Sequence, residues 1–480
     1  MSLVAELAAL DATAQAALVH RGELRPRDLV AAAIERIEGV DPALNAVITP
    51  AFDAALEAAE RVQPDAHFAG VPFLVKDLAA QVEGVAFHEG SRFLRDVVST
   101  HDTELVRRLR ASGLVILGKT NAPEFGMVPA CEPLLSGPTR NPWDVDRSTS
   151  GSSGGSAAAV ASGMVPMAHG NDLGGSLRYP ASACGVFGLK PTRARVPVGP
   201  EFGDLVGGWA CEHALTRSVR DSAGLLDALA GRMVGDPYPA PPHAGTFAGE
   251  VGLEPPPLRI GFSGRRFDGR RPHPDCVAAL EDAVALCADL GHEPVEANLP
   301  GLTAEVGAAI GTVLDAAIAW VVAHWTRKLG RPPEGDDLEP LTWAYLEAGR
   351  KVSAADYLEA VEVLQRFARR VAEFLAGVDV WLTPTLSDLP APIGAITSTA
   401  EDPLRALRNG GRTTAYAGVV ANITGNPAMS VPLWWNDADG LPVGVHFLGR
   451  YGDEATLFRL AGQMEAARPW SGRRPPVWAG

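Results

Sequence analysis

The alternation of apolar and polar positions along the chain predicts helices and short buried strands that follow one another. Residues 2–62 are rich in Ala, Leu and Glu at helical spacing, and Asp28 stands directly before the apolar run 29–34, where a carboxylate suits the first turn of a helix. The apolar run 73–75 is followed by two charged residues, Lys76 and Asp77, which is typical of a buried strand that ends at a functional edge.

The same patterns in the rest of the chain predict an α/β fold. Strands are predicted at 113–118, 258–262, 378–382, 429–432 and 443–448. Helices are predicted at 103–111, 157–165, 275–290 and 303–376, the last with a polar break at 330–339. Strands that alternate with helices favour a large mixed, mostly parallel central sheet that helices flank.

Composition and charge narrow the class of protein. The 480 residues carry a formal net charge of −15, which disfavours both a nucleic-acid platform and attraction to anionic membranes. No apolar stretch reaches the roughly 18 residues needed to span a bilayer, and the N-terminus lacks the basic start of a signal peptide, so we expect a cytoplasmic protein. Five scattered cysteines in no C-x-x-C pair predict neither a disulfide framework nor a structural metal site.

Two clusters of small residues, 151–156 and 174–176, are the most informative feature of the sequence. Glycine is costly inside regular structure, so such clusters indicate backbone that approaches a ligand closely. The first cluster precedes a predicted helix, where amide groups suit an anion. The second lies within 171–176 and presents several N–H groups to one point, as the oxyanion of an acyl-transfer reaction requires.

One interpretation of the first cluster is the nucleophile elbow of α/β-hydrolases. Residues 151–155 satisfy the G-x-S-x-G pattern, which would make Ser153 the nucleophile with Asp379 and His446 as its partners. That elbow requires a strand immediately before it, and 144–150 has no strand pattern, so we disfavour this alternative. Apart from it, His169 and His446 are expected to be packed imidazoles without a catalytic role.

The segment 148–192 resembles the signature block of the amidase signature family, whose members use a serine, a second serine preceded by a cis peptide bond, and a lysine. The resemblance covers nearly the whole chain and includes 120–126, 141–143, 188–192, 422–432 and 440–449. It implies that Ser176 is the nucleophile, Ser152 the proton relay and Lys76 the base. A lysine acts as a base only when it is neutral, so Lys76 must be buried.

The resemblance also implies supporting roles for neighbouring residues. The implied oxyanion donors are the backbone N–H groups of Leu173, Gly174, Gly175 and Ser176. The residues expected to hold the loop are Ser153, Asp172 and Arg178, and those expected to contact the substrate are Phe125, Gly126 and Met127. Positions that depart from the commoner family pattern, without removing a triad member, are Ser150, His169, Asn171 and Leu173.

On this resemblance, residues 1–480 are expected to form a single domain with the amidase signature fold. Its parts are a helical N-terminal segment 1–62, a catalytic core 65–235, a loop 236–257 with seven prolines, a helical insertion 303–376 that lines the pocket, and closing strands with a C-terminal helix at 378–480.

The expected function is hydrolysis of a carboxamide C–N bond in a small, uncharged linear or cyclic amide, through an acyl-enzyme and without a metal or cofactor. Residues 171–176, 87–90 and 11–16 resemble the branch that contains 6-aminohexanoate cyclic-dimer hydrolases. Two alternatives use the same triad: a carbamate or ester hydrolase, and the A subunit of a tRNA-dependent amidotransferase. For a stand-alone enzyme we expect no nucleic-acid or membrane partner, and a homodimer is compatible with the sequence.

Overall fold

A large mixed sheet runs through the molecule. The computed structural model describes residues 3–414, 416 and 418–480. Within this part of the chain, eleven strands pair in the order β1-β3-β2-β6-β8-β7-β12-β13-β11-β9-β10. The strands of this sheet are β1 (Val47–Pro50), β2 (Pro72–Lys76), β3 (Val115–Thr120), β6 (Met167–Asp172), β7 (Phe187–Lys190), β8 (Cys211–Thr216), β9 (Arg259–Phe262), β10 (Glu293–Glu296), β11 (Val380–Pro384), β12 (Ala428–Trp435) and β13 (Pro442–Gly449).

Parallel and antiparallel pairs occupy different parts of this sheet. The blocks β3-β2-β6 and β11-β9-β10 are parallel, whereas the other six pairs of described strands are antiparallel. Parallel strands need a crossover connection. The connection between β2 and β3 contains α5 (Glu104–Ala111), and the connection between β9 and β10 contains α9 (Pro274–Asp289). The predicted α/β architecture with a large mixed sheet is confirmed, and parallel pairing is concentrated in these two blocks.

Helices pack on both faces of the sheet because its inner strands are apolar on both sides. The other α-helices are α1 (Leu3–Ala9), α2 (Ala12–His20), α3 (Pro26–Leu44), α4 (Phe52–Ala59), α6 (Gly154–Ala161), α7 (Arg178–Cys184), α8 (Val219–Leu229), α10 (Ala304–Leu329), α11 (Pro340–Gly349), α12 (Ala354–Leu375), α13 (Arg405–Thr413), α14 (Gly418–Thr424) and α15 (Glu454–Ala467). Along β2, Phe73 and Val75 enter a core cluster with α5, α8, α9 and α15, whereas Leu74 enters another with α3, α4, α6 and α7. Successive side chains of a strand point to opposite faces, so the apolar run 73–75 indicates a strand buried on both sides.

Several strands form where the sequence predicted none: β6, β7, β8 and β10 in the main sheet, and strands in two segments that we expected to be helical or without a strand. The N-terminal segment 1–62, expected to be helical, contains β1, whose β-branched residues favour a strand and which pairs with β3. The segment 144–150, in which we expected no strand, contains β5 (Asp144–Ser148), paired with β4 (Arg140–Asn141) in a separate two-stranded sheet. The largely polar residues of β5 concealed it, because this small sheet lies outside the main core.

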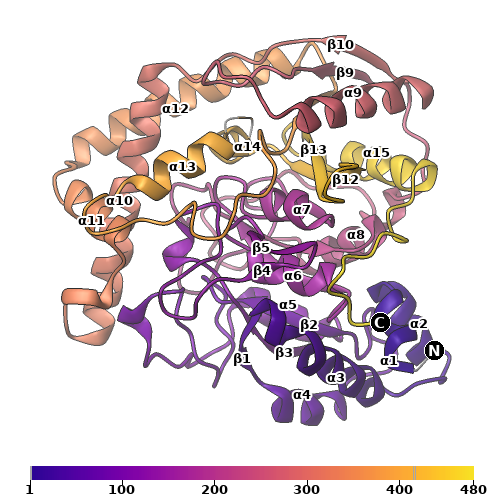
Figure 1. Cartoon of the computed structure of the whole chain (residues 1–480). Helices are drawn as coiled ribbons and strands as arrows, with labels where there is room; N and C mark the ends of the chain where they lie inside the picture. Colours follow the sequence, from indigo (N-terminus) through magenta and orange to yellow (C-terminus); the bar gives the residue numbers. More distant parts are fainter. Residues whose placement is uncertain (1–2, 415, 417) are drawn as a thin grey trace.

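The insertion 303–376 is helical as predicted and lies to one side of the sheet (Figure 1). The short 3₁₀ helix η4 (Gly335–Asp337) lies in the predicted break. By length and composition alone α10 could cross a membrane, so the expectation that no apolar stretch is long enough was wrong by this measure; Asp315 interrupts the apolar run of this helix. The buried side chains of α10 recur at helical spacing and pack in clusters with α11 and α12, so one face of this helix is part of the core.

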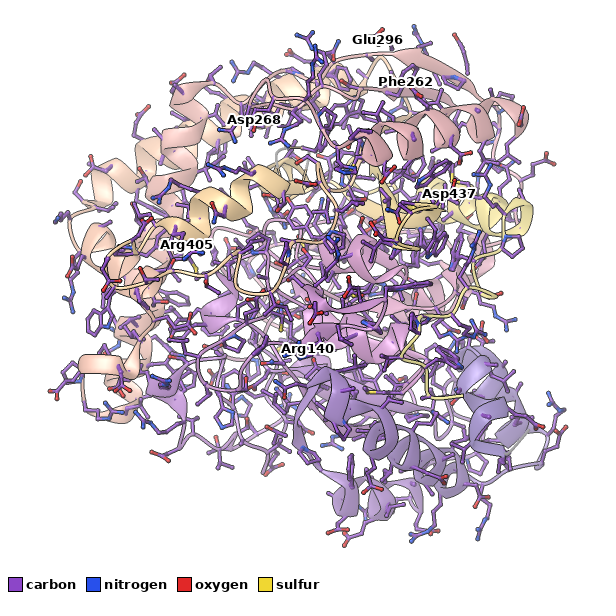
Figure 2. All side chains as sticks on the ribbon, viewed as in Figure 1. Arg140, Phe262, Asp268, Glu296, Arg405 and Asp437 are labelled. Atoms are coloured by element: carbon purple, nitrogen blue, oxygen red, sulfur yellow. The ribbon has the colours of Figure 1, made fainter. Side chains whose placement is uncertain are left out.

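Side chains fill the space between the sheet and the helices, and exposed charged residues such as Glu296 lie at the outer edge (Figure 2). The Pro-rich segment 236–257 is a loop with one short 3₁₀ helix, η3 (Ala248–Glu250). The five cysteines are buried and unpaired. The catalytic chemistry must therefore be sought among the polar residues that the central strands carry into the core.

Candidate active site

Lys76, the last residue of β2, is fully buried. Its Nζ lies 2.7 Å from Ser152 Oγ and 2.6 Å from Asn171 Oδ1. Burial lowers the pKa of Lys76 to about 7, against the opposing influence of Glu212, Cys131 and Asp172. A large fraction of this lysine is therefore neutral at neutral pH, which is the state that a base requires.

Asn171 orients the amine of Lys76. Its Nδ2 donates to the carbonyl oxygen of Leu78 at 3.1 Å, which fixes the amide so that Oδ1 faces Nζ. An amide oxygen only accepts hydrogen bonds, so one N–H of neutral Lys76 must point at Asn171. The lone pair of Nζ is then free to accept the hydroxyl proton of Ser152.

Ser152 lies in a loop between β5 and α6 that has no room for larger residues. A Cβ on Gly151 would lie 2.7 Å from backbone atoms of Ala130, and a Cβ on Gly155 would lie 2.6 Å from the backbone nitrogen of Asn121. The peptide bond between Gly151 and Ser152 is cis, as the family resemblance predicted. The glycines thus let the loop pack closely enough to bring Ser152 Oγ to Lys76.

Ser176 is the most accessible of the three residues. Its exposed fraction is 9%, compared with 1% for Ser152 and 0% for Lys76. Its carbonyl oxygen accepts a hydrogen bond from the N–H of Ser153 at 3.3 Å, and Ser153 Oγ donates to the carbonyl of Asn171 at 3.2 Å. The Ser176 hydroxyl has no hydrogen-bond partner among the described residues, so the structure forms the link from Lys76 to Ser152 but not the link from Ser152 to Ser176.

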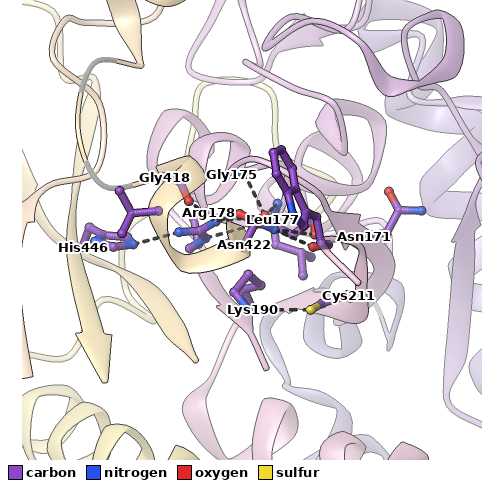
Figure 3. Close-up of polar contacts among 12 residues, drawn as sticks. Asn171, Gly175, Leu177, Arg178, Lys190, Cys211, Gly418, Asn422 and His446 are labelled. Atoms are coloured by element: carbon purple, nitrogen blue, oxygen red, sulfur yellow. Dashed lines mark hydrogen bonds and ion pairs between the residues drawn. The ribbon is translucent and has the colours of Figure 1, made fainter. Parts of the chain in front are cut away.

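A buried ion pair between Asp172 and Arg178 holds the loop that carries Ser176 (Figure 3). Asp172 Oδ1 accepts from the N–H of Gly175 at 2.7 Å, and Oδ2 accepts from the N–H of Leu177 at 3.0 Å. Burial alone would raise the pKa of Asp172, but Arg178 and these hydrogen bonds hold that pKa well below its ordinary value. The loop is therefore fixed on both sides of Ser176, which fits the supporting roles expected of Asp172 and Arg178.

The four expected oxyanion donors are not equivalent in this structure. The N–H of Gly175 already donates to Asp172 Oδ1, so its assignment as a free donor is corrected. The N–H groups of Leu173, Gly174 and Ser176 make no hydrogen bond within the described part of the chain. Gly175 instead has a conformational role: its φ is 131°, and a Cβ there would lie 2.2 Å from the ring of Tyr179. Three backbone donors remain for an oxyanion.

The expected substrate-contacting segment lies directly against Ser152. Gly126 ends the 3₁₀ helix η2 (Glu124–Gly126), and a Cβ on it would lie 3.2 Å from Ser152 Oγ and 2.7 Å from Cδ2 of Leu78. The side chains of Phe125 and Met127 pack in an apolar cluster that includes residues of α10. We call this cluster the apolar wall; its members include Phe87, Phe125, Met127, Ile318, Val322 and Trp325. The segment and the helical insertion thus meet on the same side of the site.

The geometry does not support the α/β-hydrolase alternative. Ser153 Oγ donates to a backbone carbonyl, His446 Nε2 contacts Arg178, and Asp379 pairs with Arg450, so no Ser-His-Asp arrangement forms around Ser153. The strand β5 does precede residues 151–155, so the alternative fails because the partners of Ser153 are missing and not because a strand is absent. No cluster of three or more His, Cys, Asp or Glu side chains suited to a metal ion occurs among residues 3–414, 416 and 418–480.

Comparison with known proteins identifies the family. The family model described as Amidase matches residues 28–458. The chain belongs to the amidase signature family. The 6-aminohexanoate-cyclic-dimer hydrolase of Paenarthrobacter ureafaciens is 38% identical to this amidase over 478 residues, which cover 97% of this chain and 96% of that protein. This amidase accordingly hydrolyses amide C–N bonds.

Solved structures agree with this placement of the amidase. A 6-aminohexanoate cyclic dimer hydrolase in complex with substrate is similar with a TM-score of 0.94 at 37% identity, covering 98% of this chain and 99% of that one. The A subunit of the glutamyl-tRNA(Gln) amidotransferase of Thermotoga maritima is similar with a TM-score of 0.74 at 28% identity, covering 95% of each chain. The chain is thus more similar to the cyclic-dimer hydrolase than to the amidotransferase chain.

Three residues that contact Lys76 or its neighbours in this amidase were not predicted. Asn171 holds the amine of Lys76, and the N–H of Lys76 donates to His169 Nδ1 at 3.2 Å. His169 Nε2 in turn lies 2.6 Å from Glu212 Oε2. The sequence did signal Asn171 and His169 as departures from the family pattern, but nothing marked Glu212, because β8 was not predicted.

Proposed function

We propose that this amidase hydrolyses small, uncharged cyclic and linear amides of the 6-aminohexanoate type through an acyl-enzyme on Ser176. The observation that carries this proposal is the fully buried Nζ of Lys76, 2.7 Å from Ser152 Oγ. A buried amine in contact with a hydroxyl can take a proton at neutral pH, which is the requirement for activating a serine.

The proposed reaction begins when neutral Lys76 accepts the proton of Ser152 while Ser152 accepts that of Ser176. Ser176 Oγ attacks the amide carbon, and the N–H groups of Leu173, Gly174 and Ser176 bind the oxyanion; losing one such donor typically costs about 10²–10³ in rate. Ser152 returns a proton to the nitrogen as the C–N bond breaks and the amine leaves. Water then attacks the acyl ester by the same proton route, which releases the acid and restores Ser176.

Two observations support an uncharged substrate. The wall beside Ser152 is apolar, and a charged group placed against it would lose its hydration without gaining a partner. The nearby carboxylate of Glu89 is already occupied, because Oε2 accepts from Trp325 Nε1 at 3.0 Å and Oε1 accepts from the N–H of Ala79 at 3.1 Å. The near-full-length similarity to proteins named as cyclic-dimer hydrolases favours the same class of amide.

The alternatives are separable by a single panel of substrates. Esters and aryl carbamates would acylate the same serine, and a chain that belongs to an amidotransferase complex would need its partner chains. The cytoplasmic location and the homodimer stay predictions, which cell fractionation and light scattering of the purified protein test directly. The choice between a stand-alone hydrolase and a component of a complex depends on turnover by the purified chain.

The first test is amine release by the purified chain, with Ser176→Ala as the matched control. The panel holds the 6-aminohexanoate cyclic and linear dimers, an aryl acylamide, an aryl ester and an aryl carbamate. We expect turnover of the cyclic dimer and a loss of about 10⁴-fold or more in Ser176→Ala, since removing a nucleophile leaves only the residual effect of binding and the oxyanion site. Comparable activity in both proteins would disprove the assignment of Ser176 as the nucleophile. Turnover of the ester or carbamate alone would disprove the proposal that amides are the substrates.

A further inference from the structure

Two buried side chains on neighbouring strands, His169 of β6 and Glu212 of β8, lie beside Lys76 without hydrogen-bonding Ser152 or Ser176. Their exposed fractions are 0% and 3%. Glu212 is the cross-strand partner of Asn171, the residue that holds the amine of Lys76. The pair is therefore linked to Lys76 in two ways. His169 accepts a hydrogen bond from the backbone N–H of Lys76, and Glu212 is paired on the sheet with Asn171, which contacts Lys76 Nζ.

The hydrogen bonds determine the protonation of His169. The N–H of Lys76 donates to Nδ1 at 3.2 Å, so Nδ1 carries a lone pair and no proton. The proton of the neutral ring must then lie on Nε2, which donates to Glu212 Oε2 at 2.6 Å. Burial also lowers the pKa of His169, against its hydrogen bond to Glu212. Because the ring is neutral, it does not cancel a negative charge on Glu212.

The other titratable groups around Lys76 are mostly paired with groups of opposite charge. Asp172 pairs with Arg178, and Asp77 Oδ1 lies 3.6 Å from Lys119 Nζ and near His88. No described lysine or arginine lies within ion-pair distance of Glu212. The remaining groups near Lys76 do not pair with Glu212. Cys131 is a buried thiol, and α6 carries no titratable residue. Arg36 of α3 donates to the carbonyl oxygen of Met164 instead. Glu212 thus acts on Lys76 without an ion-pair contact to a lysine or arginine among the described residues, although Lys119 also lies within electrostatic range of it.

We propose that His169 and Glu212 form a positioning pair for the base: the imidazole holds the backbone of Lys76 at the end of β2, and the carboxylate supplies the negative charge that stabilises the ammonium formed when Lys76 takes the serine proton. This inference rests on the proposed role of Lys76. No proton moves to Glu212 in this scheme. The carboxylate acts through space and through the orientation of His169, because it touches neither the substrate nor the reacting hydroxyls.

The test is the pH dependence of kcat/KM for Glu212→Gln with the 6-aminohexanoate cyclic dimer. Glutamine can still accept the hydrogen bond from Nε2 through its Oε1, so the geometry is kept while the charge is removed. Without that charge the ammonium of Lys76 is less stable, and the acid limb of the profile moves to lower pH, by about one unit. The plateau falls by about threefold, because a weaker base removes protons more slowly.

Three further variants separate the possible results. Glu212→Asp keeps the charge and should restore the wild-type limb. His213→Gln, on the same strand but bonded to Ser222, should leave the limb unchanged. Lys76→Met should be inactive, and if it remains active the proposed mechanism itself fails. If Lys76→Met is inactive but folded Glu212→Gln keeps the wild-type limb, only the positioning pair is disproved.

If Glu212→Gln does not fold, a measurement on the wild-type protein still tests the positioning pair. Nitrogen-15 NMR of histidine-labelled protein reports the protonation of each ring nitrogen. We expect His169 to remain neutral, with its proton on Nε2, from pH 6 to pH 8. An imidazolium, or a proton on Nδ1, in that range would overturn the proposal.

Discussion

At the scale of single residues, the position of Lys76 rather than its residue type creates a base. An exposed lysine keeps its proton far above neutral pH. Here burial lowers the pKa to about 7, and Ser152 and Asn171 fix the amine at 2.7 and 2.6 Å. Only the neutral amine accepts a proton, so kcat/KM of the wild type should rise as pH increases toward about 7 and level off above it. This profile is the reference for substitutions around Nζ.

Asn171→Asp should move that profile in the direction opposite to Glu212→Gln. A carboxylate placed beside Nζ stabilises the ammonium and raises the pKa of Lys76, by about one to three units for an adjacent opposite charge. At pH 7 we expect kcat/KM to fall about tenfold or more and to recover at higher pH. Asn171→Leu, which cannot hold the amine, should lower kcat at every pH. A wild-type profile for Asn171→Asp would show that residue 171 does not contact the base in solution.

At the scale of elements, η2 meets both the segment after β2 and the loop before α6 at Gly126, which has a φ of 69° and lies against Leu78 and Ser152. Gly126→Ala should lower kcat about tenfold or more, because its Cβ would meet Ser152 Oγ at 3.2 Å and small displacements of reacting groups are costly. Gly84→Ala is the matched control: its φ is 76°, but its Cβ would meet no atom within 4 Å. Both variants carry the same backbone strain of about 1 kcal/mol.

Steady-state kinetics and thermal unfolding of the two glycine variants give the comparison. We expect a small loss of stability in Gly84→Ala and a larger one in Gly126→Ala, whose Cβ must also displace Cδ2 of Leu78, with a loss of kcat in Gly126→Ala alone. Equal kcat values in the two variants would mean that Gly126 does not pack against Ser152.

The elements that the sequence predicted well are those with a simple pattern. The continuous apolar run of β2 and the long periodic helices 303–376 show their burial directly. The sequences of β5 and β8 do not show that these segments are strands, because both contain many polar residues. They are strands because they pair with neighbouring strands in the fold. In the site, the expected triad followed from the resemblance of 148–192 to the amidase signature block. The engagement of Gly175 by Asp172, and the position of Glu212 across from Asn171, depend on loop geometry and strand register that no local pattern encodes.

At the scale of the whole molecule, Arg178 joins the segment that carries Ser176 to the C-terminal part of the chain. Besides Asp172, its guanidinium donates to the carbonyl of Gly418, to Asn422 Oδ1 and to His446 Nε2, which lie 240 to 268 residues away in the sequence (Figure 3). Burial lowers the pKa of His446 well below its ordinary value, and Arg178 lowers it further, so the ring accepts as a neutral imidazole. The catalytic loop is therefore held by β13 and α14 as well as by its own strand.

Arg178→Met should consequently destabilise the whole fold rather than the loop alone. It leaves the carboxylate of Asp172 buried without its cation, a change that typically costs about 3–5 kcal/mol of the free energy of unfolding. Arg366→Met, which removes an exposed pair with Glu359 on α12, should cost little, because solvent screens such pairs. Urea unfolding at pH 7 compares the two, and kcat should fall only in Arg178→Met. If Arg178→Met unfolds at the same urea concentration as Arg366→Met, the ion pair contributes no more than a surface contact, and the C-terminal strands must be held to the catalytic loop by apolar packing.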